Sequence, residues 1–384
     1  MKKIFFYALI VLNFSCKSFD DFRNQKVLLI SNKSEKIESK NGAYYLNLKI
    51  NGVSGNFLFD TGAMTSVIDD DAFLKGLNLN EKNYYTSFKL KSADGVQIES
   101  RAFVSDSISS TIIKGDKNIF KHINNIKAKI NCDKDNFISS GIIGFDIFKR
   151  AAQPILFDIK NNLITVLETK YSTAGYQKIG GKIATGLGDE ITIPLKVENK
   201  LINFTLDSGF NGGILISPKS INIDKSKLVA TFEAGYFVLN KLINKKTEVY
   251  NNVSIEKSYL FDEPAIISST TNINHNLLGT SFIKQFNWIF DFNTGDVYVK
   301  RIAKDDSDLI DKINKYQLKC LAINNDLIIG FKKSPSFLQY NIGDQIISVN
   351  GSPVTTENIC EMQDLLNKTQ DWNTLKLEVI TPKK

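Results

Sequence analysis

The chain has 384 residues, of which 42% are hydrophobic and 11% aromatic, so it can bury substantial cores and is not an intrinsically disordered chain. Its formal net charge is +7, but the 48 basic residues are scattered among 41 acidic ones without the basic stripe that nucleic-acid binding needs, so we expect no nucleic-acid partner. Two histidines and four well-separated cysteines give no zinc-ligand spacing and few bases for a Ser-His or Cys-His enzyme, which leaves acid–base chemistry to carboxylates and predicts no metal.

The N-terminus predicts an exported protein. Two lysines precede an apolar run at residues 4–14, which is too short to span a bilayer and is typical of a signal peptide at 1–16. The small residue before Cys16 resembles the lipobox of bacterial lipoproteins, with Asn13 where that motif usually has Leu. The resemblance implies lipidation of Cys16 and a membrane anchor in the cell envelope. Ordinary signal cleavage nearby is the alternative, and it predicts a periplasmic or surface protein.

The remaining cysteines do not form a complete disulfide framework. Cys132, Cys320 and Cys360 are left when Cys16 is set aside, and an odd number cannot be fully paired. A bond between Cys320 and Cys360 is one of the pairings, and the spacing alone does not select it.

Residues 45–60 predict a β-hairpin that carries a carboxylate at its end. Apolar and polar residues alternate through a first strand, break at Asn51-Gly52 and resume in a second strand that ends at Asp60. A second hairpin is predicted between Phe88 and Ile98, because an Asp-Gly pair between alternating apolar positions is a strong turn signal. Three residues form its predicted tip: Ala93, Asp94 and Gly95.

The first hairpin and its acidic end recur later in the chain. The stretch 45–62 aligns without gaps with 192–209, and the two aspartates lie 147 positions apart. Asp207-Ser208-Gly209 therefore stands where Asp60-Thr61-Gly62 stands in the first copy. Several strand positions match as well: Leu46 with Ile193, Leu48 with Leu195, Ile50 with Val197, Asn56 with Asn203, and Phe57 with Phe204.

The repeat extends beyond the hairpins. Segment 141–145 corresponds to 276–280, and each is followed by a short amphipathic segment, a Phe-Asp pair and a closing strand. This pattern predicts two duplicated β-rich halves, residues 38–170 and 178–303. Between them, residues 172–188 are rich in Gly, Ser and Thr and are predicted to be a linker.

The last 80 residues, 305–384, are predicted to form one small domain after a charged break. Apolar residues surround an Asn-Gly turn at 350–351, and a helix near 356–366 and a strand at 375–380 are expected. The segment 343–351 is similar to the Gly-Asp-x-Ile-x-x-(Val/Ile)-Asn-Gly core of PDZ domains. The resemblance implies a small α+β PDZ-like domain, which either captures peptides or packs against the rest of the chain.

The paired aspartates define the chemistry that the sequence permits. Asp60 and Asp207, at equivalent places in two pseudo-symmetric halves, can meet on the shared axis, where two like charges cannot both ionise. One shared proton would leave an ionised carboxylate to take a proton from water and a neutral one to donate a proton to a carbonyl oxygen.

The flanking residues suit the support of such a pair. Gly62 and Gly209 let the backbone approach the carboxylates and present N–H donors to them. Thr61 and Ser208 each carry a hydroxyl that can donate and accept, which is suited to holding the two loops together.

These motifs resemble those of the retropepsin-like aspartic peptidases over residues 38–303. The resemblance implies a mainly β fold with two pseudo-symmetric acid-protease β-barrel lobes plus the small PDZ-like domain. It also implies an aspartic-type endopeptidase that acts on a peptide or protein, uses no cofactor and works as a monomer, because both copies lie in one chain. The motifs that carry it are Asp60-Thr61-Gly62-Ala63, Asp207-Ser208-Gly209, Ile142-Ile143-Gly144 and Leu277-Leu278-Gly279.

The family gives further expectations. Its apolar-apolar-Gly strand passes beneath the aspartate loop, which is the place implied for Gly144 and Gly279. A flap covers its cleft and clamps an extended peptide, and the hairpin tip at 93–95 is the candidate, with a weaker counterpart near 234–236. Phe210 departs from the family, which usually has Ala, Ser or Thr there.

Two other functions remain open at this stage. One is a catalytically silent, envelope-tethered scaffold that binds peptides, and the other is an interaction protein that works through the PDZ-like domain. Four residues are given structural roles: His122 is expected to be solvated, His275 to cap a strand, and Asp158 and Asp291 to accept structural hydrogen bonds.

Overall fold

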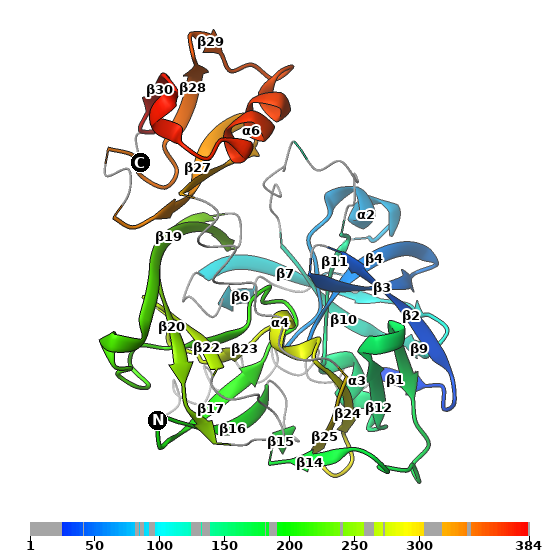
Figure 1. Cartoon of the computed structure of the whole chain (residues 1–384). Helices are drawn as coiled ribbons and strands as arrows, with labels where there is room; N and C mark the ends of the chain where they lie inside the picture. The colour runs from blue at the N-terminus through cyan, green and yellow to red at the C-terminus, as the bar shows by residue number, and fades with distance from the viewer. Residues whose placement is uncertain are drawn as a thin grey trace, which may run out of the picture.

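The structure is a computed structural model of the chain (Figure 1). It describes residues 25–40, 42–80, 84, 88–91, 97–123, 132, 139–180, 182–183, 190–238, 241–256, 265–271, 273–302, 317–335 and 339–382. The signal segment with Cys16 and the hairpin tip Ala93-Asp94-Gly95 lie outside these ranges. Within them the chain is mainly β, and none of the helices is both long and apolar enough to cross a membrane.

The first predicted hairpin forms β3 (Ala43–Ile50) and β4 (Val53–Asp60), which pair antiparallel. Asn51 and Gly52 make the turn with φ of 49° and 81°, a conformation that Asn and Gly adopt more readily than other residues. Every second residue of β3 is buried, so the alternation in the sequence matches the two faces of the strand.

In the first half, β11 (Gly141–Gly144) passes between two other strands. It runs parallel to β4 and antiparallel to β5 (Val67–Ile68), and the sheet continues through β10, β7 and β6. The remaining elements of this half are β1 (Lys26–Leu29), β2 (Ser34–Lys40), α2 (Asp71–Gly76), β6 (Phe88–Lys91), β7 (Gln97–Ser105), β8 (Ile108–Ser109), β9 (Ile113–Asp116), β10 (Asn118–His122), α3 (Asp146–Ala151), β12 (Ile155–Asp158), η2 (Ile159–Asn161) and β13 (Leu163–Val166).

The second half repeats this strand order. The path β3-β4-β11-β5-β10-β7-β6 corresponds to β16-β17-β23-β18-β22-β20-β19, and the parallel and antiparallel pairings match along both paths. The elements are β16 (Ile191–Val197), β17 (Lys200–Leu206), β18 (Ile214–Ile216), η3 (Lys225–Lys227), β19 (Leu228–Val238), β20 (Lys241–Val253), β21 (Ile255–Glu256), β22 (Ala265–Thr270), β23 (Leu277–Leu278), α4 (Thr280–Ile283), β24 (Phe286–Asp291) and β25 (Asp296–Arg301).

One antiparallel sheet joins the two halves. β12 of the first half pairs with β24 of the second, with Phe157 opposite Trp288. The linker prediction for 172–188 was only partly right, because β14 (Gln177–Ile179) pairs with β25 and β15 (Lys182–Ile183) pairs with β16. These short strands give hydrogen-bond partners to strand edges that would otherwise be open.

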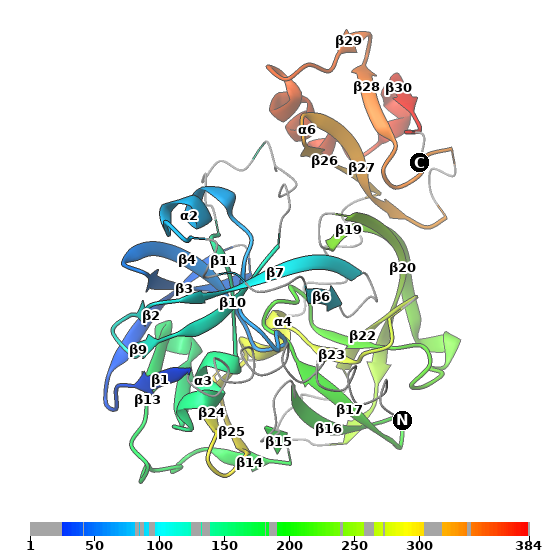
Figure 2. The ribbon, with the colours of Figure 1, turned by 180° about the vertical axis from the view of Figure 1, so that it is seen from behind.

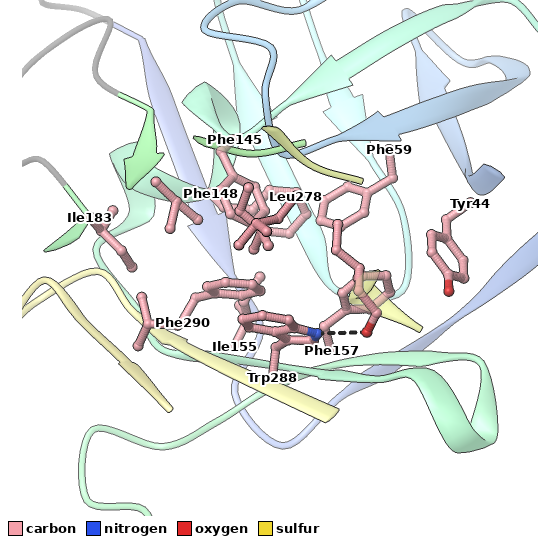
Figure 3. Packing of buried hydrophobic residues seen from close by; sticks show 14 of the residues in the cluster. Tyr44, Phe59, Phe145, Phe148, Ile155, Phe157, Ile183, Leu278, Trp288 and Phe290 are labelled. Carbon is pink, nitrogen blue, oxygen red and sulfur yellow. Dashed lines mark hydrogen bonds between the residues drawn. The ribbon is translucent and has the colours of Figure 1, made fainter. Parts of the chain in front are cut away.

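A dense aromatic core lies behind this sheet (Figure 3). The Trp288 side chain is fully buried, stacks on Phe290 with ring centroids 6.0 Å apart, and donates its indole N–H to the Ile283 carbonyl. Phe59, one residue before Asp60, makes ring contacts with Phe145, Phe148 and Phe157. The strand that ends at Asp60 is therefore fixed by close packing.

Residues 317–382 form a C-terminal unit with its own core. Its helix α6 packs beside β26, and its sheet joins the second half because β27 pairs antiparallel with β19. Figures 1 and 2 place this unit at one end of the molecule and β24 and β25 at the other. Its elements are β26 (Leu318–Ile323), β27 (Asp326–Lys333), β28 (Gln345–Val349), β29 (Ser352–Pro353), α6 (Ile359–Lys368), η4 (Trp372–Thr374) and β30 (Leu377–Ile380).

The disulfide joins distant parts of the chain. Cys360 in α6 bonds to Cys132 of the first half, 228 positions away, and Cys320 is a buried free thiol. The Cys320–Cys360 pairing is therefore wrong. Cys320 points into the apolar core of the C-terminal unit, whereas Cys360 lies near the start of α6, where Cys132 reaches it.

Candidate active site

The two aspartates occupy equivalent positions at the ends of paired strands. Asp60 is the last residue of β4 and lies opposite Gly144 of β11, and Asp207 directly follows β17. Gly144 and Gly279 lie close beneath the two aspartate loops. A β-carbon on Gly144 would collide with the Ala63 carbonyl, and one on Gly279 would collide with the Gly212 carbonyl. The close passage of these strands therefore needs glycine.

Thr61 and Ser208 form a reciprocal set of four hydrogen bonds across the two halves. The Thr61 N–H donates to Ser208 Oγ and the Ser208 N–H donates to Thr61 Oγ1, each at 2.9 Å. Each hydroxyl then donates to a carbonyl of the other half, Thr61 to Leu206 at 2.7 Å and Ser208 to Phe59 at 2.6 Å. Both side chains are buried, so these bonds fix the two loops relative to each other without competition from water.

Each glycine of the motif lies against the aspartate of the other half. A β-carbon on Gly62 would come within 2.8 Å of the Asp207 carboxyl carbon, and one on Gly209 would collide with the Asp60 carboxylate. Within each loop, the Gly62 N–H donates to Asp60 Oδ1 at 2.8 Å, and the Gly209 N–H donates to Asp207 Oδ1 at 3.0 Å. The two carboxylates therefore meet on the pseudo-symmetry axis with little space between the loops.

Burial raises the pKa of both carboxyl groups. For Asp207, the charge of Asp60 adds to burial and holds its pKa well above the usual range. For Asp60, hydrogen bonds from the Gly62 N–H and from Asp207 oppose the effect of burial on the pKa. Both carboxyl groups therefore hold a proton to higher pH than an ordinary aspartate and titrate together as a pair, and both residues remain partly exposed.

Phe210, the departure from the family motif, is accommodated by the residues around it. Its ring packs against Gly212 and Gly279, where any β-carbon would collide with it. It also contacts a small apolar cluster of Leu215, Ile273 and Leu277. Its N–H donates to Asp207 Oδ1 at 3.0 Å, so the residue supports the aspartate through its backbone.

A charged network that was not predicted lies beneath the first loop. Ser66 Oγ accepts from the Gly144 N–H and donates to Asp146 Oδ1 at 2.8 Å, and Arg150 donates to Asp146 Oδ2 at 2.9 Å. Burial raises the pKa of Asp146 although Arg150 opposes it. The Asp–Arg spacing of four residues in a helix was the available signal.

The hairpins that were expected to cover the site both form strands. In the first half β6 pairs with β7, with Lys91 opposite Gln97, and the tip lies outside the described residues. In the second half, the prediction of a turn at 234–236 was wrong. Gly235 lies inside β19 opposite Asn244, and the last pair before the turn is Val238 with Lys241.

The minor predictions had mixed outcomes. His122 is buried, not solvated, because alternate residues of β10 face inward, and burial lowers its pKa despite Asp71 at 3.6 Å. Asp158 and Asp291 accept structural hydrogen bonds, as predicted. Asn276, and not its neighbour His275, fixes the chain where it enters β23. The Asn276 side chain accepts from the Ser217 N–H and donates to the Asn203 carbonyl.

The outer edge of β26 in the C-terminal unit is covered by side chains of α6. Gln363 Oε1 accepts from the Ala322 N–H, and Asn367 Oδ1 accepts from the Cys320 N–H at 2.9 Å. Asn367 also donates to the Cys320 carbonyl. These side-chain amides already hydrogen-bond to the backbone N–H and C=O groups with which a bound peptide strand would have to pair.

The described residues contain no cluster of three or more His, Cys, Asp or Glu side chains able to hold a metal. No protein-family model matches the chain. A comparison with curated proteins finds no match either.

Proposed function

We propose that the protein is an aspartic-type endopeptidase whose catalytic pair is Asp60 and Asp207. The observation that carries the proposal is the reciprocal arrangement of the two loops, in which each glycine lies against the other half's aspartate and Thr61 and Ser208 exchange hydrogen bonds. Such a pair acts on a bound water without a covalent intermediate. The two halves would be the two lobes of an acid protease, complete within one chain.

The proposed mechanism assigns different tasks to the two carboxyl groups. Asp60, ionised, takes a proton from a water between the two carboxyl groups, and that water attacks the peptide carbonyl carbon. Asp207, protonated, donates to the carbonyl oxygen as negative charge develops there. Support for this assignment comes from the raised pKa of Asp207, caused by burial and by the charge of Asp60.

The substrate is proposed to be an extended peptide segment. β6 is the last strand on its sheet path, so the first hairpin offers an edge to which an extended chain can hydrogen-bond. The corresponding edge of β19 in the second half is paired with β27. The first hairpin is therefore our candidate flap.

The C-terminal unit is proposed to be a PDZ-like domain with a supporting role. Its β26 edge is covered by Gln363 and Asn367, and its β27 is engaged by β19, which favours packing over peptide capture. Export through the signal at 1–16, with lipidation of Cys16 or ordinary cleavage, remains the proposal for location in the cell envelope.

A silent scaffold is the less favoured alternative. A bulky Phe210 beside the motif would favour this alternative if its ring covered the carboxyl groups. The ring packs against Gly212 and Gly279 instead, and Asp60 and Asp207 remain partly exposed. Retained aspartates with a shared proton are what hydrolysis requires, whereas peptide binding alone has no need of them.

The test is cleavage of a diverse peptide mixture, from acidic to neutral pH, by the chain lacking residues 1–16. We expect a bell-shaped pH profile, because activity needs one proton on the pair and is lost when that proton leaves or a second one binds. Asp60→Asn and Asp207→Asn should each lower kcat at least ~1000-fold, since each removes one member of the acid–base pair.

Asp116→Asn is the matched control, because Asp116 is an exposed residue of β9 outside the site. It should keep the cleavage pattern and the pH profile. The same pattern in all three variants would refute the assignment of the catalytic pair, and absence of any cleavage by the folded chain would favour the scaffold.

A further inference from the structure

The residue that follows the Asp-x-Gly triplet differs between the two halves. It is Ala63 in the first half and Phe210 in the second. The Phe210 N–H donates to Asp207 Oδ1 at 3.0 Å, and the residue is partly exposed. Phe210 therefore lies directly beside one carboxyl group of the pair.

The Phe210 ring covers an apolar face of the second half. Leu277 of β23 lies opposite Leu215 of β18, and these two side chains form a small buried cluster with Ile273. Gly279 is two positions beyond Leu277 in an extended conformation, so it belongs to the same face of the chain. A β-carbon on Gly279 would lie 2.5 Å from the Phe210 ring, so the ring occupies the space that this glycine leaves. Beneath the ring, Leu277 is only 7% exposed.

The matching face of the first half is more open. Ile142 of β11 is the repeat partner of Leu277, and it lies opposite Val67 of β5. Ile142 is partly exposed, because Ala63 has only a methyl group where the second half has a phenylalanine ring. Met64, the next residue, is 53% exposed and adds apolar surface to the same loop. The first half therefore keeps open an apolar surface that a ring covers in the second.

An extended peptide held at the carboxyl pair can contact both faces. Successive side chains of an extended chain point to opposite sides. The two loops are related by the pseudo-twofold arrangement of the halves, so their apolar faces lie on opposite sides of the pair. The two residues that flank a bond at the pair therefore meet one half each.

We propose that Phe210 makes the two halves select different side chains: the first half takes a large apolar residue next to the cleaved bond, and the second half takes only a small one. A large side chain on the second side would have to displace a ring that is packed on Leu277 and Gly279, and overfilling a packed apolar site is unfavourable. This inference rests on the proposed endopeptidase function and names the substrate class of that same site.

The test uses four peptides that share one sequence taken from the cleaved members of the diverse mixture. The two residues that flank the cleaved bond are Phe–Ala, Ala–Phe, Phe–Phe or Ala–Ala. The parent chain should cleave one mixed order with a kcat/KM at least ~10-fold higher than the other mixed order and than Phe–Phe, because apolar sites discriminate side-chain size by such factors. The favoured order shows which side of the bond lies on the first half.

Two variants change the two sides in opposite directions. Phe210→Ala removes the ring and should bring kcat/KM for Phe–Phe and both mixed orders within ~3-fold of one another. Ala63→Phe places a ring in the first half and should lower kcat/KM for the favoured order at least ~10-fold. If the alanine variant does not fold, as judged by thermal unfolding, Phe210→Val opens the same side with less loss of packing.

Two further variants are controls. Phe210→Tyr keeps the ring and should keep the preference of the parent chain. Leu201→Ala is matched to the alanine variant, because Leu201 is an apolar residue of the same half that is 69% exposed near the start of β17. Equal rates for the two mixed orders in the parent chain would overturn the proposal. A preference that survives Phe210→Ala, or that Leu201→Ala abolishes, would overturn it too.

Failure of the proposed function gives a different result. If no peptide of the mixture is cleaved, the endopeptidase assignment fails. The selection of side chains is then measured by fluorescence anisotropy, with the same four residue pairs placed in one labelled serine-threonine peptide. A dissociation constant at least ~10-fold lower for one mixed order than for Phe–Phe, with the difference removed by Phe210→Ala, supports the role of Phe210. Equal affinities, or no binding, refute it.

Discussion

At the scale of single residues, the site brings together two buried carboxyl groups whose pKa values are raised. Burial and the charge of Asp60 raise the pKa of Asp207 above that of an aspartate in the unfolded chain. Unfolding at a pH between the unfolded and folded pKa values therefore releases a proton. The contribution of Asp207 to stability is complete below the unfolded pKa and is lost as the pH rises through the folded pKa.

Asp207→Asn should therefore stabilise the fold above the unfolded pKa of aspartate and have little effect below it. The amide does not ionise, so folding no longer requires a carboxylate that is ionised in the unfolded chain to take up a proton. The gain in free energy of unfolding should grow by up to ~1.4 kcal/mol per pH unit between the unfolded and folded pKa values. Thermal unfolding of both chains at several pH values measures it, and a gain that is independent of pH would argue against a raised pKa.

Ser208 is buried and holds the two aspartate loops together through its hydrogen bonds to the first half. Ser208→Ala removes a hydroxyl that accepts from the Thr61 N–H and donates to the Phe59 carbonyl, and it leaves both groups buried without partners. We expect a loss of ~2 to 4 kcal/mol in the free energy of unfolding. Misplaced loops should lower kcat more than they raise KM.

Ser208→Thr is the conservative control, because the equivalent residue of the first half is Thr61. It should retain the loop contacts and most of kcat. If the alanine and threonine variants had the same kcat, the exchange of hydroxyl bonds would have no part in positioning the pair.

At the scale of elements, the strand that passes beneath each loop requires glycine. Gly144→Ala should destabilise the first half by more than ~2 kcal/mol, because its β-carbon would collide with the Ala63 carbonyl and nearby atoms cannot give way without moving the loop of Asp60. Gly213→Ala is the control, since its β-carbon would meet no atom within 4 Å. Denaturant unfolding compares the two, and equal losses would mean that the close approach does not limit stability.

Elements also show where patterns in a sequence are reliable. The β3–β4 and β16–β17 hairpins follow from alternation and from two-residue turns, Asn51-Gly52 and Glu198-Asn199, so they are local properties of the chain. The turn of the second long hairpin was misplaced because Gly235 is a strand residue there. It is needed for close packing by Leu242 and Ile342, which no local pattern reveals.

At the scale of the whole molecule, the C-terminal unit links two halves that are already joined at the opposite end. Its β27 extends the second hairpin, while the first hairpin ends its sheet at β6. The second hairpin is thereby paired on its outer edge, whereas the sheet path of the first half ends at β6. The two halves share a strand order but differ in what pairs with their hairpins.

The sequence by itself determined the repeat, the position of both aspartates and the loop motifs, because duplicated strands and tight turns are encoded by residues close together in the chain. Only the tertiary structure decided that burial and Asp60 raise the pKa of Asp207, which cysteines bond, and that His122 is buried. Each of these depends on burial or on a contact between segments far apart in sequence. Desolvation and approach in space have no local pattern, so the electrostatics of the site and the links that the C-terminal unit makes to both halves are properties of the folded chain alone.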